Sequence, residues 1–378
     1  AAAREALVAI PVSGESILRQ VAPARPGVRA ELLAVLAARR EPAAGRALAE
    51  AIRGDSAEVR LAALRLAGAV DDPSLEPLLV RWAEHGEPLE RAAAAASLLE
   101  RARTLQGRGA SRRARELFRE LVRIADGPRE LAGAIQGLAA LEGEAALGTL
   151  AALDDRSSLR EPIARARIAI AAELAGRERG RARELLEEVC AGPASRTLRK
   201  VAARRLETLG GDPAAAARRR GCLTQWRVSE SFPDAPAEGP EGAQGPATEL
   251  GLHPFGSDVA AHAARWRAVT SSDPDGAVDL AALLDPDQDV VAYAYAELAS
   301  PLAREAQLLV GSDDGVAIWV NGVRVHSNRV SRRLTPDEDR VPVTLREGTN
   351  SILVKVAQGG GDWGFCVRVV GADGRALE

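Results

Sequence analysis

The spacing of apolar residues divides the chain into two parts with different periods. Through residues 1–221, apolar residues recur at intervals of three and four, as they do on one face of an α-helix. Segment 56–70 (SAEVRLAALRLAGAV) is typical, and Ser56 stands where a helix N-cap is expected. Pro or Gly interrupts the pattern at short intervals, so this part predicts a series of short helices.

The predicted helices also repeat. Three aligned segments each carry an arginine near their start, and these residues, Arg29, Arg60 and Arg91, stand 31 positions apart. Two short helices in about thirty residues are typical of an α-solenoid, in which each repeat buries its apolar face against its neighbours. We predict strict repeats over about 26–107 and looser helix pairs over 108–221. The arginines are expected to donate to carbonyls or acids of the neighbouring repeat.

The pattern changes to period two near residue 222. Alternating apolar and polar residues predict short strands at 226–229, 265–269, 290–299, 306–310, 316–320, 323–327, 340–345, 351–356 and 365–370. Asn321-Gly322 predicts a tight hairpin, because both turn residues must tolerate positive φ. The Pro- and Gly-rich segment 233–258 predicts a long loop. The expected fold class is therefore α then β: an α-solenoid followed by an antiparallel β-sandwich of the jelly-roll kind.

Composition changes at the same place as the period. Residues 1–221 hold 37 basic and 30 acidic residues and two of the eleven aromatics, whereas the remainder holds 13 basic and 23 acidic residues. We therefore predict two domains, an α-solenoid over 1–221 and a β-sandwich over 222–378. The interspersed acids and the scarcity of aromatics in the first part argue against a nucleic-acid partner. No run of eighteen apolar residues exists, so no membrane span is expected.

Residue usage adds little chemistry. The chain has only two lysines among its 50 basic residues and is rich in alanine, which indicates a GC-rich bacterial source. It contains no methionine, so a processed or truncated chain is expected. The three cysteines, Cys190, Cys222 and Cys366, fit neither a disulfide framework nor a zinc site, and we expect buried, inert thiols.

Segment 57–79 (AEVRLAALRLAGAVDDPSLEPLL) resembles HEAT repeats, in the short form found in bacterial phycobilisome-lyase-like proteins. The looser pairs that follow resemble a more tetratricopeptide-like arrangement. The resemblance implies a solenoid surface for a protein partner. The alternative is a spacer that only carries the second domain.

A second resemblance lies in segments 311–328 (GSDDGVAIWVNGVRVHSN) and 343–356 (VTLREGTNSILVKV). Both look like the core of galactose-binding-like jelly rolls, and the order Asp-Asp-Gly, Trp, Gly is similar to the protective-antigen-type lectin domain. In sugar-binding members of that family, adjacent aspartates hold a Ca²⁺ that coordinates glycan hydroxyls. The resemblance therefore implies carbohydrate binding at Asp313 and Asp314, Ca²⁺ as a candidate cofactor, and export from the cytoplasm. Candidates for further ligands on other loops are Asn328, Asp337, Asp339 and Asp362.

Each candidate has a structural alternative. Asp313 and Asp314 also suit an ordinary turn, in which their side chains accept local N–H groups. Trp363, beside three glycines, is either an exposed platform for a sugar ring or a plug folded back into the end of the sandwich. Trp319 is expected to pack against its neighbours rather than to bind a ligand.

No catalytic motif appears. The four histidines are His85, His253, His262 and His326, and the pair His253 and His262 has no acid in ligand spacing. Members of a catalytic triad need not be close along the chain, so spacing alone leaves a triad open. No nucleophile elbow, zinc-protease motif or phosphate loop is present. We predict a non-enzymatic binding or scaffold protein, whose helical repeats carry a carbohydrate-binding module. The alternatives are an assembly factor that makes only protein contacts, and an accessory region of a larger glycan-degrading enzyme.

Overall fold

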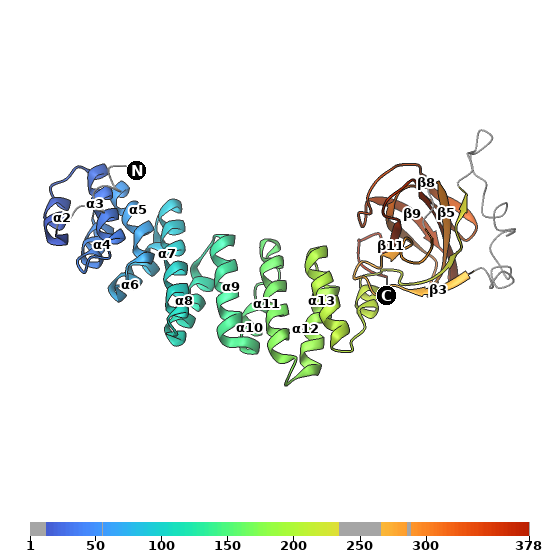
Figure 1. The fold of residues 1–378 in the computed structure, drawn as a ribbon, viewed down its shortest axis with the longest axis horizontal. Coiled ribbons are helices and arrows are strands. Elements are labelled where there is room, and N and C mark those ends of the chain that lie inside the picture. Colours follow the sequence, from blue (N-terminus) through green and yellow to red (C-terminus); the bar gives the residue numbers. More distant parts are fainter. Residues whose placement is uncertain (1–12, 55, 234–265, 286–288, 378) are drawn as a thin grey trace. The chain divides into compact units, whose positions relative to one another are not determined.

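The structure, a computed structural model, describes residues 13–54, 56–233, 266–285 and 289–377. The chain forms helices first and then two antiparallel sheets (Figure 1). It divides into two compact units, 1–173 and 174–378, so the last helices belong to the same unit as the strands. The change from helix to strand falls between Arg219 and Gln225, next to the change in composition.

The helices follow one another in short pairs. Their bounds are α2 Gly14–Val21, α3 Pro26–Ala38, α4 Ala44–Arg53, α5 Ala57–Leu66, α6 Glu76–His85, α7 Pro88–Gly107, α8 Ser111–Ile124, α9 Pro128–Glu142, α10 Leu147–Ala151, α11 Arg160–Leu174, α12 Arg179–Ala191, α13 Arg196–Thr208 and α14 Pro213–Arg219. Short 3₁₀ turns join some of them, as at Pro73–Leu75 and Gly143–Ala146. The helical N-terminal part predicted from the period of three and four is confirmed.

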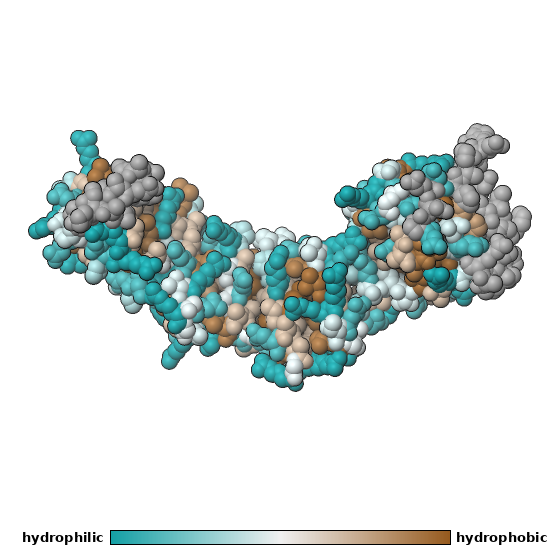
Figure 2. Space-filling view, in the orientation of Figure 1, coloured by the Kyte–Doolittle hydropathy of each residue, from teal (hydrophilic) through white to brown (hydrophobic). Residues whose placement is uncertain are grey.

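Local signals explain where the helices begin. Ser56 caps α5 as predicted, because its hydroxyl accepts a hydrogen bond from the backbone N–H of Val59. Proline occupies the first turn of α3, α7, α9 and α14, where its missing N–H costs nothing. Helix α9 approaches α8 closely at Gly137, since a Cβ there would lie 2.4 Å from the ring of Phe118. Surface side chains are mostly polar on the visible face of these helices, with smaller apolar patches between them (Figure 2).

The repeated arginines join successive repeats. Arg60 donates from Nε to Glu90 Oε1 at 2.8 Å and from Nη1 to the Gly54 carbonyl at 2.9 Å. Its guanidinium also lies 4.5 Å from the centre of the Trp82 ring. Arg91 makes the equivalent contacts one repeat later, with Asp126 and the Gly86 carbonyl. The structural role predicted for this column is therefore confirmed at Arg60 and Arg91.

The strands form two antiparallel sheets. Their bounds are β1 Gln225–Ser229, β2 Phe232–Pro233, β3 Trp266–Thr270, β4 Val278–Asp279, β5 Val290–Ser300, β6 Arg304–Asp313, β7 Val316–Val320, β8 Val323–Asn328, β9 Asp339–Leu345, β10 Gly348–Gln358 and β11 Gly364–Gly371. One sheet has the order β3-β1-β5-β10-β7-β8, with β2 also paired to β5, and the other has the order β4-β11-β6-β9. Each predicted strand corresponds to an observed one. The predicted loop at 233–258 lies outside the described residues except for Pro233, which belongs to β2 and pairs with Val290, so the loop prediction is wrong at this residue.

The core of this part lies where the inward faces of the two sheets meet. Ile318, Val354 and Val367 are fully buried there, and the Trp226 and Phe365 rings pack edge to face with centroids 4.9 Å apart. A second buried cluster lies apart from this core, on β5, β7 and β10. Its members are Val291, Tyr293, Tyr295, Trp319 and Leu353.

The two segments that resemble known jelly rolls meet at one end of the sandwich. Asn321 and Gly322 have φ values of 50° and 83°, as the tight hairpin requires. The Asn321 amide donates to Asn350 Oδ1 at 2.8 Å, and Asn321 Oδ1 accepts from the backbone N–H of Ser351. Fully buried Asn350 in turn bonds the backbone of Arg346 and Gly348. These asparagines therefore hold two turns together, which gives both sequence segments a structural purpose.

All three cysteines are free and buried, as predicted. Burial raises the pKa of Cys190 to about 12 and that of Cys222 to about 11, so both thiols stay protonated at neutral pH. Of the histidines, His85 is exposed at the end of α6 and His326 lies 3.4 Å from Asp339, whereas His253 and His262 lie outside the described residues. Among the helices that the structure describes, none is long and apolar enough to cross a membrane.

Candidate ligand-binding cleft

Strand pairing brings Asp313 and Asp362 to the same end of the sandwich. Asp313 is the last residue of β6, and in the antiparallel register it lies opposite Gly364, the first residue of β11. Residues just before Gly364, including Asp362 and Trp363, therefore reach the end of the sheet beside Asp313. A cleft of about 630 Å³ opens there. Its walls come from β3, β4, the loops around them, α13 and the segment before β9, and the lining includes Thr270, Ser271, Ser272, Asp273, Asp279, Asp313, Arg333, Asp362, Arg196 and Lys200.

Four aspartates line the cleft, and two of them, Asp313 and Asp362, differ in exposure. Asp313 is only 7% exposed, whereas Asp362 is exposed. Burial raises the pKa of Asp313 above its ordinary value, and the nearby carboxylates of Asp314 and Asp362 act in the same direction against a hydrogen bond from the Leu334 backbone. Asp313 is thus an acceptor held on a rigid strand end.

Cations also line the cleft. Arg333 is exposed there, and Lys200 Nζ lies 3.3 Å from Asp273 Oδ2 on the wall that α13 contributes. Hydroxyl groups of Thr270 and Ser272 complete a surface that offers both hydrogen-bond donors and acceptors.

Asp314 has a different role from its neighbour. Its Oδ1 accepts hydrogen bonds from the Ser331 hydroxyl at 2.9 Å and from the Arg332 backbone N–H at 3.0 Å. Its Oδ2 accepts from the Gly359 backbone N–H at 2.8 Å. The peptide bond between Asp313 and Asp314 is cis. Asp314 therefore ties two loops to the end of β6, and its carboxylate oxygens are engaged within the protein.

The other predicted oxygen ligands lie elsewhere and are paired. Asn328, at the end of β8, donates to Asp339 Oδ1 at 3.4 Å. Asp339 also accepts from Arg332, and Asp337 accepts from Nε and Nη2 of Arg368. None of these three oxygen-bearing side chains lines the cleft. Of the proposed partners for Asp313, only Asp362 is brought beside it.

Both candidate tryptophans are buried. Trp363 is 2% exposed and belongs to the core between the sheets, so it occupies the sandwich end instead of offering an exposed ring. Its indole Nε1 has no hydrogen-bond partner within the described part of the chain. Trp319 packs in the second cluster beside Tyr293 and Leu353, as expected.

Sequence reasoning missed Asp275, which fixes one wall of the cleft. Asp275 is 4% exposed and lies in the turn between β3 and β4. Its carboxylate accepts from Arg199 on α13 and from Arg220 after α14, the latter at 2.8 Å, and Arg196 Nε lies 3.2 Å away. Burial alone would raise the pKa of Asp275, but Arg220 and Arg199 hold it below its ordinary value. A pair of aspartates in the turn SDPDG was the only signal in the sequence.

The residues present do not form the calcium site that the resemblance implies. Of the adjacent aspartates, Asp314 has both oxygens engaged by three protein donors, which leaves Asp313 and Asp362 as neighbouring carboxylates. Calcium takes six to eight oxygen ligands, commonly several carboxylates. Within the ranges that the structure describes, no group of three or more His, Cys, Asp and Glu side chains is arranged to hold a metal.

Comparisons with known proteins give only distant likenesses. No family model matches the chain, and no curated protein matches it. One similar solved structure is the PA14 domain of the antifreeze protein MpAFP, at 20% identity and a TM-score of 0.21, covering 23% of this chain and 47% of that one. This chain thus spans about half the length of that structure.

Two further solved structures are similar at this level. The PA14 sugar-binding domain from an RTX adhesin has 20% identity and a TM-score of 0.23, over 39% of this chain and 89% of that chain. The alkylpurine DNA glycosylase AlkC of Pseudomonas fluorescens, bound to DNA, has 11% identity and a TM-score of 0.29, over 99% of this chain and 95% of that chain. At these scores the likenesses carry no argument about ligand or activity.

Proposed function

We propose that this chain is a non-enzymatic binding protein whose β-sandwich binds carbohydrate in the cleft at Asp313. The observation that carries the proposal is the placement of Asp313 and Asp362 side by side, with Arg333 and several hydroxyl groups around them. Sugar hydroxyls both donate and accept hydrogen bonds, so a wall that offers both kinds of group suits them. A volume of about 630 Å³ also falls within the range of ligand sites.

In this proposal the sugar is held by hydrogen bonds to side chains and not by stacking. Trp363 is buried and supplies the rigid end of the sandwich, so it supports the cleft without an exposed ring. Asp313 accepts hydrogen bonds from sugar hydroxyls, and Arg333 donates to them. The helical repeats carry this module and offer a surface to a protein partner.

A glycan array probed with the full chain tests the proposal. We expect hits that persist in EDTA, because no metal is required. Asp313→Asn, which removes the charge but keeps the shape, should weaken binding by about tenfold, the effect of losing one charged hydrogen bond.

Glu347→Gln is the matched control. Glu347 is an exposed carboxylate in the turn between β9 and β10, at the opposite end of the sheet from Asp313. This variant should bind as the wild type does. A blank array with and without Ca²⁺ would overturn carbohydrate binding and favour an assembly factor. Hits that EDTA abolishes would overturn the metal-free mode of binding.

A further inference from the structure

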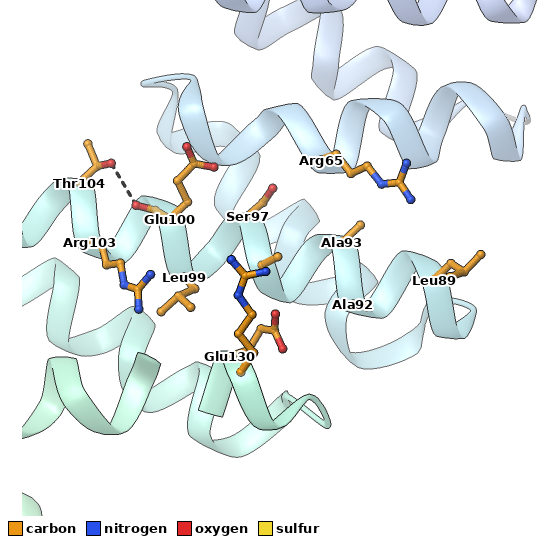
Figure 3. A pocket seen from close by; sticks show the side chains of 12 residues that line it. Arg65, Leu89, Ala92, Ala93, Ser97, Leu99, Glu100, Arg103, Thr104 and Glu130 are labelled. Carbon is orange, nitrogen blue, oxygen red and sulfur yellow. Dashed lines mark hydrogen bonds between the residues drawn. The ribbon is translucent and has the colours of Figure 1, made fainter. Parts of the chain in front are cut away.

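A second hollow lies in the helical unit, far along the chain from the cleft. It has a volume of about 570 Å³ and is lined by residues of three alternate helices, α5, α7 and α9. We call it the α7 groove; its lining residues are Arg65, Leu89, Ala92, Ala93, Ala96, Ser97, Leu99, Glu100, Arg103, Thr104, Arg129 and Glu130. Figure 3 shows the side chain of Arg65 on one side of α7, with Arg103 and Glu130 on the side of α9.

Three arginines of the groove, Arg65, Arg103 and Arg129, are exposed. Arg65, Arg103 and Arg129 make no hydrogen bond or ion pair with any residue that the structure describes. Other arginines on or beside α7 are paired: Arg101 donates from Nε to Glu76 at 2.7 Å, and Arg91 bonds Asp126. Ion pairs elsewhere in this region join neighbouring repeats. The three groove arginines are therefore the ones that can pair with the carboxylates of a ligand.

The floor of the groove is apolar and made of small residues. Ala92 and Ala96 are exposed along α7, and Leu89 at its start is 67% exposed. A leucine this exposed beside two alanines leaves a shallow surface that an apolar side chain of a partner can cover. From Leu89 to Thr104 the helix runs about 22 Å, a length that an extended peptide spans with about seven residues.

Two acids interrupt the positive charge. Glu100 and Glu130 line the groove together with the arginines. A continuous polyanion such as a nucleic-acid backbone would place phosphates against both carboxylates, whereas a peptide can present neutral side chains there.

We propose that the α7 groove binds an acidic peptide segment of a partner protein, about seven residues long, with acidic side chains flanking one apolar side chain. The carboxylates pair with Arg65, Arg103 and Arg129, and the apolar side chain lies on Leu89, Ala92 and Ala96. This assignment rests on the proposed role of the helical repeats as a platform for a protein. It does not involve the sandwich cleft.

A heptapeptide library displayed on phage and selected on the immobilised full chain tests the assignment. The selected sequences should be enriched in Asp and Glu around a single apolar residue. A fluorescent copy of the best peptide should bind in an anisotropy titration and weaken as salt rises. Arg103→Glu should weaken it by about tenfold or more, because a favourable charge contact becomes a repulsive one.

Arg81→Glu is the control for overall charge, since Arg81 is exposed on α6 and does not line the groove. It should leave the peptide affinity unchanged within about twofold. Three outcomes would overturn the assignment: no enrichment over the Arg103→Glu protein, enrichment of basic peptides, or tighter binding of a mixed-sequence DNA duplex than of the peptide. Glycan binding is measured on the same samples, so that a failure of peptide binding at the groove can be told apart from a failure of glycan binding at the cleft.

Discussion

The α7 groove and the sandwich cleft are hollows of similar volume with opposite charge, and the difference follows from how each is built. The groove lies on helices stacked in repeats, where arginines that do not join neighbours remain on the surface. The cleft lies at strand ends, where turns supply aspartates such as Asp313 and Asp362. In our proposal the two hollows are independent sites, one for an acidic peptide and one for the hydroxyl groups of a sugar.

The largest effect is expected at Asp275, which fixes α13 and α14 to the cleft wall. Asp275→Ala leaves Arg199 and Arg220 without their buried partner, so it should lower the free energy of unfolding by about 3 to 5 kcal/mol. Urea denaturation measures this loss. Glycan binding should fall with it, while the α7 groove keeps its peptide. A loss below about 1 kcal/mol would show that the contact contributes little.

Substitutions of the two adjacent aspartates, Asp313 and Asp314, should have different effects. Asp314→Ala leaves three hydrogen-bond donors without their acceptor, so it should lower the free energy of unfolding by about 2 to 3 kcal/mol. Asp313→Asn should cost no stability at neutral pH and should instead weaken glycan binding. Thermal melts of both variants, with titrations of the best array hit, measure the contrast. Equal destabilisation by the two changes would contradict the separate roles.

Two arginines on α5 provide the same kind of contrast in the helical unit. Arg60→Ala removes hydrogen bonds to Glu90 and to the Gly54 carbonyl, and the side chains of Arg60 and Glu90 are both largely buried. The change should therefore lower the free energy of unfolding by about 1.5 to 3 kcal/mol. Arg65→Ala should cost less than about 0.5 kcal/mol, because Arg65 is exposed and has no such contact among the described residues. Chemical denaturation compares them, and a larger loss for Arg65 would refute the division between joining and available arginines.

The smallest effect is a pH dependence. The folded state raises the pKa of Asp313, so it binds a proton more tightly there than the unfolded chain does. The contribution of Asp313 to the free energy of unfolding should therefore fall as pH rises from the ordinary value of 3.8 through the raised pKa. Urea denaturation from pH 3.5 to pH 7 should show Asp313→Asn gaining stability relative to the wild type. A constant difference would contradict the raised pKa.

The fold followed from the sequence because its signals are local. Apolar period, caps and turn residues depend on near neighbours, and Ser56 and Asn321-Gly322 took the conformations that their types favour. Strands β2 (Phe232–Pro233) and β4 (Val278–Asp279) are missing from the predicted set, because a strand of two residues is too short to show a period. The end of β6 was placed three residues early, since Ser312 and Asp313 read as turn residues.

The site was less predictable because it depends on register and packing. The sequence alone does not bring Asp313 and Asp362 together, because their proximity depends on the register of β6 and β11, in which Asp313 lies opposite Gly364. Nothing in the sequence distinguishes Asp313 from Asp314, whose roles depend on which backbone donors reach each carboxylate. The available arginines of the α7 groove likewise become visible only when the stacking of α5, α7 and α9 shows which cations have partners.

The most direct test of two independent sites measures both ligands on the same proteins. The best glycan and the best acidic heptapeptide are titrated against the wild type, Asp313→Asn and Arg103→Glu by isothermal calorimetry. We predict that Asp313→Asn loses about tenfold in glycan affinity and keeps the peptide, and that Arg103→Glu does the reverse. If either change weakens both ligands equally, or neither, the two hollows are not separate sites and the account is wrong.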